Sequence, residues 1–188
     1  MTGSFISPHG GYHTLLSYQK ALIVYDATVY FCDRFYHRPD RTIDRMVQAA
    51  RSGKQNIIEG SQASGTSKET EIRLTNVARA SFEELLDDYR DFLRVQGLQE
   101  WPPGHPYTKR LRELNSRPDA DYETFRKGIE HADPEVSANV VIWLVKVTTF
   151  LLDTQLQQPE QTYLKDGGLR ERMYNARLAE HSKPKNGI

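Results

Sequence analysis

Residues 66–97, TSKETEIRLTNVARASFEELLDDYRDFLRVQG, decide the fold class. Their apolar side chains recur with the spacing of one face of an α-helix, which predicts a long amphipathic helix. Thr66 and Glu69 have the spacing of a capping box, and Gly97 is a typical helix stop. The apolar stripe comprises Ile72, Thr75, Ala78, Phe82, Leu85, Leu86, Tyr89, Phe92 and Leu93.

The segments on either side of this helix also have helical patterns. A first helix is expected over residues 14–37, and a second begins at Asp40, a residue suited to an N-cap, after Pro39 breaks the first. Gly60 and Gly65 bracket the turn that follows the second helix. Residues 98–106 contain three prolines, which favour a loop.

Two shorter helices are expected over 107–115 and 121–130, and a last long helix runs over 134–158 after an Asp133-Pro134 start signal. No alternation typical of strands is found, so the sequence predicts an all-α protein. We expect a flexible lead-in over 1–13, a helical bundle over 14–158 and a C-terminal suffix over 159–188 with a short basic amphipathic helix.

Composition restricts the setting of the protein. The 188 residues carry 25 Lys and Arg against 25 Asp and Glu, a net charge of zero, and contain one cysteine. A net charge of zero argues against a protein that binds nucleic acid over its whole surface, but it allows a local basic face. We expect a cytoplasmic protein without membrane contact, for three reasons. Cys32 is the single cysteine, no signal peptide is visible, and the apolar stretch over 140–152 is too short to span a bilayer.

The sequence lacks the motifs of common enzyme and cofactor sites. The histidines are scattered, and neither phosphate-binding glycine motif occurs, so we expect no metal, no cofactor and no enzymatic activity. Cys32 has the surroundings of a small buried hydrophobe. An acidic cluster is expected to be a solvated helix face, with a divalent-ion site as the alternative; it comprises Glu83, Glu84, Asp87, Asp88 and Asp91.

A basic stretch gives the sharper functional hypothesis. Between residues 34 and 54, six basic residues oppose two aspartates, a net charge of +4. Arginines grouped on one face can neutralise phosphates, so the candidate nucleic-acid-binding residues are Arg34, Arg38, Arg41, Arg45 and Arg51. The alternative is a solvated face, or salt bridges to the acidic cluster of a neighbouring helix or subunit.

Short motifs in the second and third helices resemble a known family. Residues 55–60 read QNIIEG, residues 67–69 read SKE and residues 81–85 read SFEEL. These motifs resemble the four-helix-bundle proteins encoded by 23S rRNA intervening sequences, a family that includes accessory variability proteins of diversity-generating retroelements. Residues 166–177 are similar to the extension of its four helix bundle suffix subgroup.

The resemblance implies an up-down four-helix bundle that assembles as a ring-like homopentamer. Relatives in retroelements bind nucleic acid and contact a reverse transcriptase, so the resemblance makes RNA, DNA and such an enzyme candidate partners. The family motif matches Asn56, Glu59 and Gly60, to which we assign a structural role. Gly60 would end the second helix, and the other two side chains would hydrogen-bond backbone or a neighbouring chain there.

The first and last long helices have more apolar residues than one core needs, which predicts self-association. The sequence thus favours a non-enzymatic, oligomeric adaptor that binds nucleic acid or a nucleic-acid enzyme through its arginines. The alternative is a purely protein-binding or structural homo-oligomer.

Overall fold

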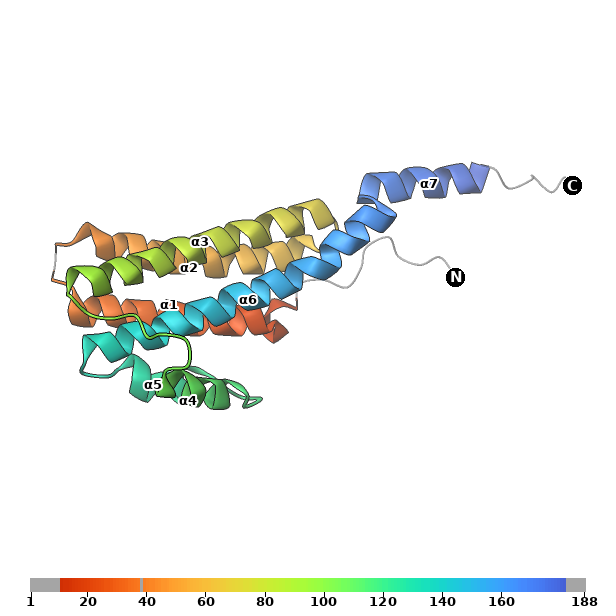
Figure 1. Cartoon of the computed structure of the whole chain (residues 1–188). Helices are drawn as coiled ribbons and strands as arrows, with labels where there is room; N and C mark the ends of the chain where they lie inside the picture. The colour runs from red at the N-terminus through yellow and green to blue at the C-terminus, as the bar shows by residue number, and fades with distance from the viewer. Residues whose placement is uncertain (1–10, 38, 182–188) are drawn as a thin grey trace, which may run out of the picture.

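The computed structural model describes residues 11–37 and 39–181, and within these ranges it is helical with no strand (Figure 1). A short 3-10 turn, Tyr12–Thr14, comes first, so the end of the expected lead-in has regular structure, while residues 1–10 lie outside the described ranges. The helices are α1 (Leu16–Phe35), α2 (Arg41–Ala63), α3 (Lys68–Val95), α4 (Pro106–Asn115), α5 (Tyr122–Ile129), α6 (Pro134–Asp166) and α7 (Leu169–His181).

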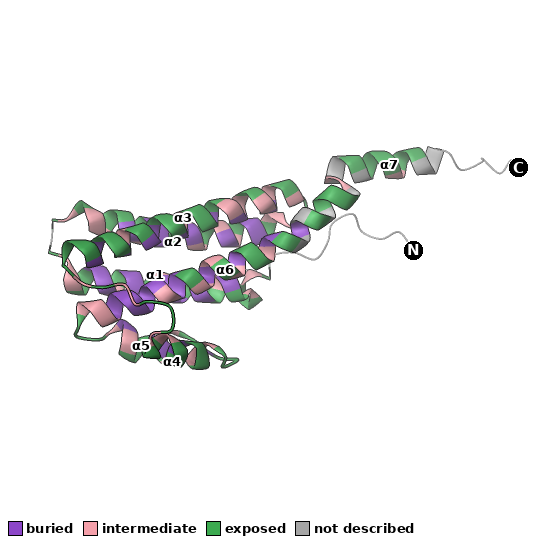
Figure 2. Ribbon diagram, viewed as in Figure 1, coloured by how far each residue is buried: buried purple, intermediate pink, exposed green. Residues whose placement is uncertain are grey.

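The four long helices enclose the core. α2 packs against α1 and α3, and α6 packs against the other sides of the same two helices (Figure 1). α5 lies against α6 and α1, with α4 beside it. The purple residues in Figure 2 follow the inner faces of the long helices, and the largest fully buried side chains include Phe31, Phe82, Tyr89 and Leu144.

Helix starts follow the local signals closely, with one correction. Asp40, Asp121 and Asp133 each accept a hydrogen bond from a backbone N–H of the helix that they cap, which satisfies an otherwise orphan donor. The expected Thr66 cap is wrong by one residue. Ser67 caps α3 by accepting from the backbone N–H of Thr70 at 3.1 Å, because the Thr66 hydroxyl instead donates to a carbonyl at the end of α2.

The last long helix does not end near residue 158. α6 continues through Pro159 to Asp166, so the proline costs one backbone hydrogen bond without breaking the helix. Gly167 ends it instead, with φ +67°, a conformation that glycine adopts without strain. The suffix therefore begins as an extension of α6, which with α7 projects away from the long helices (Figure 1). We call residues 159–181 the arm.

The composition of α6 reflects its position. Residues Pro134–Gln157 are long and apolar enough to cross a membrane, and 56% of their most apolar window is buried inside the protein. Val141, Leu144 and Val145 of this helix are fully buried, and α6 packs against α1 and α3. Contacts within the fold thus account for about the buried half of the apolar run, while Phe150 on the same helix is exposed.

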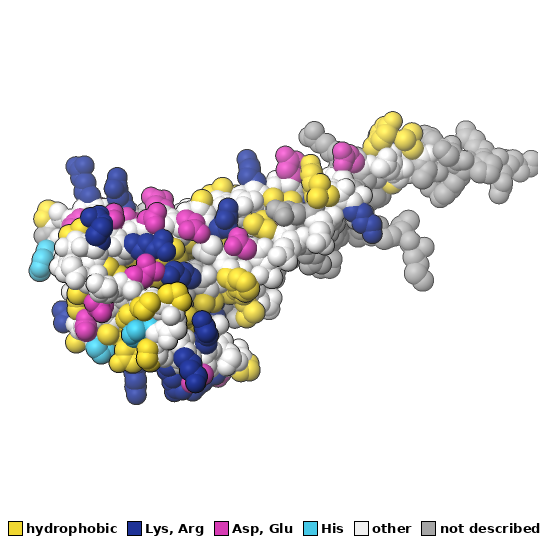
Figure 3. All heavy atoms as spheres, in the orientation of Figure 1, with side chains coloured by type: hydrophobic (Ala, Val, Ile, Leu, Met, Phe, Trp, Pro, Cys, Tyr) yellow, Lys and Arg dark blue, Asp and Glu magenta, His cyan; other side chains and the backbone are white. Residues whose placement is uncertain are grey.

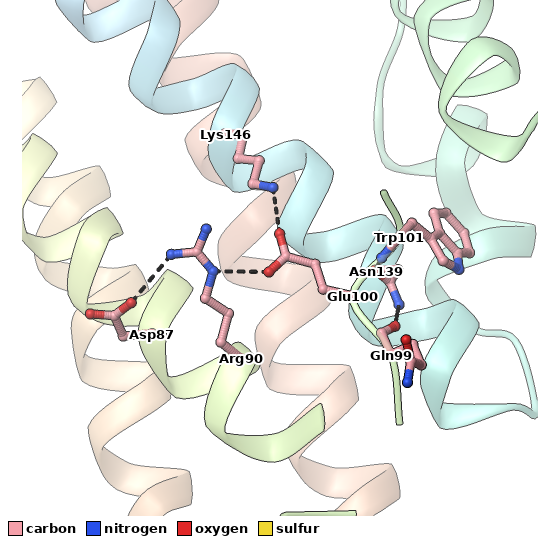
Figure 4. Close-up of polar contacts among 7 residues, drawn as sticks. All are labelled: Asp87, Arg90, Gln99, Glu100, Trp101, Asn139 and Lys146. Atoms are coloured by element: carbon pink, nitrogen blue, oxygen red, sulfur yellow. Dashed lines mark hydrogen bonds and ion pairs between the residues drawn. The ribbon is translucent and has the colours of Figure 1, made fainter. Parts of the chain in front are cut away.

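A buried amide attaches the proline-rich loop to α6 (Figure 4). Asn139, which is 2% exposed, accepts from the backbone N–H of Trp101 at 2.7 Å and donates to the carbonyl of Gln99 at 2.8 Å. Between these residues, Glu100 accepts hydrogen bonds from Lys146 of α6 at 2.6 Å and from Arg90 of α3 at 3.0 Å. The loop is thereby fixed across the ends of two long helices, which sets the position of Trp101.

Candidate functional site

The candidate arginines lie around the connection between α1 and α2. Arg34 is in the last turn of α1, Arg41 begins α2, and Arg45 follows one turn later. These three and Arg51 are exposed, and Arg38 lies outside the described residues. Over residues 11–37 and 39–181, no carboxylate comes within ion-pair distance of Arg34, Arg41, Arg45 or Arg51. The arginines are therefore free to meet an external anion.

The arginines do not form one compact cluster. The guanidinium of Arg34 lies 5.6 Å from the ring centroid of its neighbour Phe35. Arg45 lines an open groove of about 980 Å³ that follows α2 between α1 and α3. Arg51 is six residues further along α2, which at 100° per residue puts it on a different side of the helix from Arg45. Arg41 and Arg45 are the pair most nearly on one face.

Polar side chains line this groove, which we call the α2 groove, where α2 meets α3. The hydroxyls of Ser52 and Ser81 are 3.1 Å apart and join the two helices. Gln48 and Glu84 line the same groove, and its α1 side carries Tyr25 and Val29 among other side chains. The groove thus offers hydrogen-bonding groups beside apolar surface, an arrangement suited to binding rather than to a defined reaction.

A smaller pocket of about 420 Å³ adjoins the arginines at the end of α3. Arg45 lines it together with Asp88, whose Oδ2 is buried without a hydrogen-bond partner among the described residues. Burial raises the pKa of Asp88, the charge of Glu84 raises it further, and Arg45 opposes both effects. Arg45 therefore offsets part of the cost of a half-buried carboxylate.

Two of the other four acids in the α3 cluster form ion pairs within the chain. Asp87 pairs with Arg90 at 3.4 Å, and Asp91 pairs with Arg94 at 2.8 Å. Within the described ranges, no three histidine, cysteine or carboxylate side chains are grouped so that they could hold a metal ion. These carboxylates are exposed and i,i+3-paired, which is typical of a solvated helix face.

Cys32 lies in the core. It is 1% exposed, and its Sγ is 3.9 Å from the Sδ of Met46. Burial raises the pKa of the Cys32 thiol to about 12, and the charges of Asp88 and Asp40 add to the shift. The neutral thiol is a poor nucleophile, so Cys32 contributes packing only.

The three motif residues lie in the second half of α2, and one assignment is corrected. Asn56 donates to the carbonyl of Ser52 at 2.8 Å, and Glu59 accepts from Gln55 at 3.2 Å. Gly60 does not end the helix, because α2 continues to Ala63 and Gly60 has no positive φ. Gly60 is buried against α3, where an added Cβ would lie 3.5 Å from Leu74.

Sequence reasoning missed two buried charged side chains. Glu71 is 8% exposed and pairs with Lys68 at 2.8 Å. Lys20 is 5% exposed, and its ammonium donates to the carbonyl of Ala120 at 3.0 Å. Burial lowers the pKa of Lys20, and Asp121 partly opposes the shift. The signal was a lysine between apolar residues of α1, but its partner lies 100 residues away and only the fold brings them together.

No family model, curated protein or solved structure matches this chain.

Proposed function

We propose that this protein is a non-catalytic helical adaptor that binds nucleic acid, or an enzyme that acts on nucleic acid, through the arginines around the α1–α2 connection. One observation carries the proposal: Arg34, Arg41, Arg45 and Arg51 are exposed and have no ion pair within the described part of the chain. Unpaired arginines lose few existing contacts when they meet phosphates, and each phosphate contact releases counterions.

The fold and the assembly belong to the same proposal. The ring of contacts among α1, α2, α3 and α6, with a reversal of the chain at each connection, supports an up-down four-helix bundle (Figure 1). We further propose that the protein is a homo-oligomer, a pentamer by its resemblance to the intervening-sequence proteins. Exposed Leu22 and Val29 on α1 and Phe150 on α6 supply apolar surface for a partner subunit.

A purely structural oligomer is the second candidate, and the arm favours it. Figure 3 shows hydrophobic side chains exposed along the arm, where Leu164 is 84% exposed and Met173, Tyr174 and Leu178 are also exposed. On the long helices, the same view shows basic and acidic side chains interspersed, which weakens the attraction of that face for a polyanion. If the protein is a purely structural oligomer, the oligomer forms without nucleic acid, and adding nucleic acid does not change it.

Fluorescence anisotropy with labelled single-stranded and double-stranded RNA and DNA separates the two candidates. We expect binding at low salt that weakens as salt rises, and a large loss of affinity in the double variant Arg41→Glu/Arg45→Glu. The control is Arg112→Glu/Arg117→Glu, which makes the same change in net charge at two exposed arginines elsewhere. No binding at low salt, or equal losses in both variants, refutes direct binding of nucleic acid through these arginines.

Light scattering tests the assembly independently. We expect the mass of an oligomer for the native chain and a smaller mass for Leu164→Glu. Val95→Glu, a substitution at another highly exposed apolar residue on α3, should keep the native mass. A native chain that is a folded monomer in dilute solution refutes the oligomer. If the oligomer instead dissociates as salt rises, its subunits are held by charge pairs.

A further inference from the structure

A pocket of about 330 Å³ lies on the side of the molecule that α4 and α5 cover, away from the α2 groove. We call it the α4–α5 pocket. Its walls are apolar and come from three helices and the proline-rich loop: Trp101, Leu111, Leu114, Phe125, Val136 and Val140. A pocket of this size with mostly apolar walls is typical of small-molecule sites.

The walls are fixed before any ligand binds. Phe125 is 1% exposed and Leu111 is 6% exposed. The backbone of Trp101 is held by Asn139, and its ring stacks on that of His105, with centroids 4.5 Å apart and planes 10° apart. Because these side chains are already ordered, a ligand would not have to order them.

The rim of the pocket is basic. Arg110 of α4, Lys127 of α5 and His131 after α5 line it, and no carboxylate does. The nearby acids of α5 are engaged elsewhere, since Arg126 pairs with Glu123 at 3.2 Å and with Glu130 at 3.1 Å. Arg110 pairs with Glu113 at 3.1 Å, whereas Lys127 has no ion pair within the described residues, so Lys127 is the side chain open to an external carboxylate.

We propose that the α4–α5 pocket binds a small amphipathic carboxylate. The apolar body of the ligand lies between Trp101, Leu114 and Phe125, and its carboxylate meets Lys127, with Arg110 beside it. Charge complementarity selects this occupant, because a neutral apolar molecule would leave Lys127 without an ion pair and a cation would be repelled by it.

Octanoate is the test ligand, with 1-octanol and octylamine as neutral and cationic molecules of the same chain length. The readout is the fluorescence of Trp101 in a Trp143→Phe background, since the chain has two tryptophans. We expect saturable binding of octanoate, and at least about fivefold weaker binding of octanol and octylamine, as the loss of one exposed charge contact implies.

Lys127→Glu should weaken octanoate binding about five- to tenfold, because it replaces attraction by repulsion. Lys109→Glu, an exposed lysine of α4 that does not line the pocket, should change binding less than about twofold. Val136→Phe should weaken octanoate binding by occupying part of the pocket. If Val136→Phe does not fold, the comparison of Lys127→Glu with Lys109→Glu still tests the proposal.

Three results overturn the proposal: no saturable change with octanoate, equal affinity for octanoate and octanol, or equal effects of the two lysine variants. None of them affects the proposed binding of nucleic acid, because none of the candidate arginines lines this pocket. Loss of RNA binding in the arginine variants would likewise leave octanoate binding intact.

Discussion

Alanine in place of Gly53 and of Gly60, both buried on α2, should change stability in opposite directions. In a helix interior, replacing glycine by alanine stabilises the folded protein by about 1 kcal/mol when there is space for the added Cβ. At Gly60 the new Cβ would lie 3.5 Å from its nearest neighbours, an ordinary contact, so we expect Gly60→Ala to stabilise by about 0.5–1 kcal/mol. At Gly53 the Cβ would lie 2.6 Å from two ring carbons of Phe82.

The clash at Gly53 determines the magnitude. Carbon atoms in contact prefer about 3.5–4.0 Å, so the Phe82 ring must move by about 1 Å. Phe82 is 0% exposed, so overpacking should cost about 1–3 kcal/mol and outweigh the gain in helix propensity. We expect Gly53→Ala to be less stable than Gly60→Ala by about 1–3 kcal/mol.

Urea unfolding followed by far-UV circular dichroism measures both variants, at one protein concentration because association would shift the transition. Equal stability of the two variants would refute the close packing of Gly53 on Phe82. Strong destabilisation by Gly60→Ala would refute the position of Gly60 inside α2, because it would indicate a helix-ending glycine with positive φ.

Two further predictions concern the proline-rich loop. Asn139→Leu leaves the backbone groups of Gln99 and Trp101 without hydrogen-bond partners, so we expect the free energy of unfolding, measured in urea, to fall by about 2–3 kcal/mol. The control Gln99→Ala keeps the backbone groups and should change this free energy little. Burial alone would raise the pKa of Glu100, but hydrogen bonds from two cationic side chains outweigh it and lower that pKa. Glu100 therefore stabilises the fold above its ordinary carboxyl pKa, and this stabilisation is lost as pH falls through the lower folded-state pKa. The free energies of unfolding of the native protein and of Glu100→Gln should therefore converge at acid pH. A difference that persists at acid pH would contradict these hydrogen bonds to Glu100.

Local signals in the sequence located the helices well because caps and breaks act over a few residues. Asp40 and Asp133 cap α2 and α6 as expected, and the apolar stripe of residues 66–97 faces the core. Three local signals misled. Thr66 does not cap α3, Gly60 does not end α2, and Pro159 does not stop α6. Gly60 stays helical because it is buried against α3, a contact that no local pattern records.

The candidate site was predictable only as a set of residue types. The charge pattern indicated a basic stretch, but the spacing along the chain could not say which arginines share a face or lack an ion pair. Arg45 lies beside Asp88 of α3, 43 positions away in the sequence. The α4–α5 pocket had no sequence signal, because its walls come from a loop and three helices that meet only in the fold.

The sequence by itself determined that the chain is helical, where most helices begin, and that it is neutral overall. Periodicity, caps and composition are local or additive properties, so they can be read without a fold. The tertiary structure alone decided which charges pair, that Lys20 and Asn139 are buried and satisfied, and where pockets remain. These depend on contacts between residues far apart in the chain, which no local pattern records.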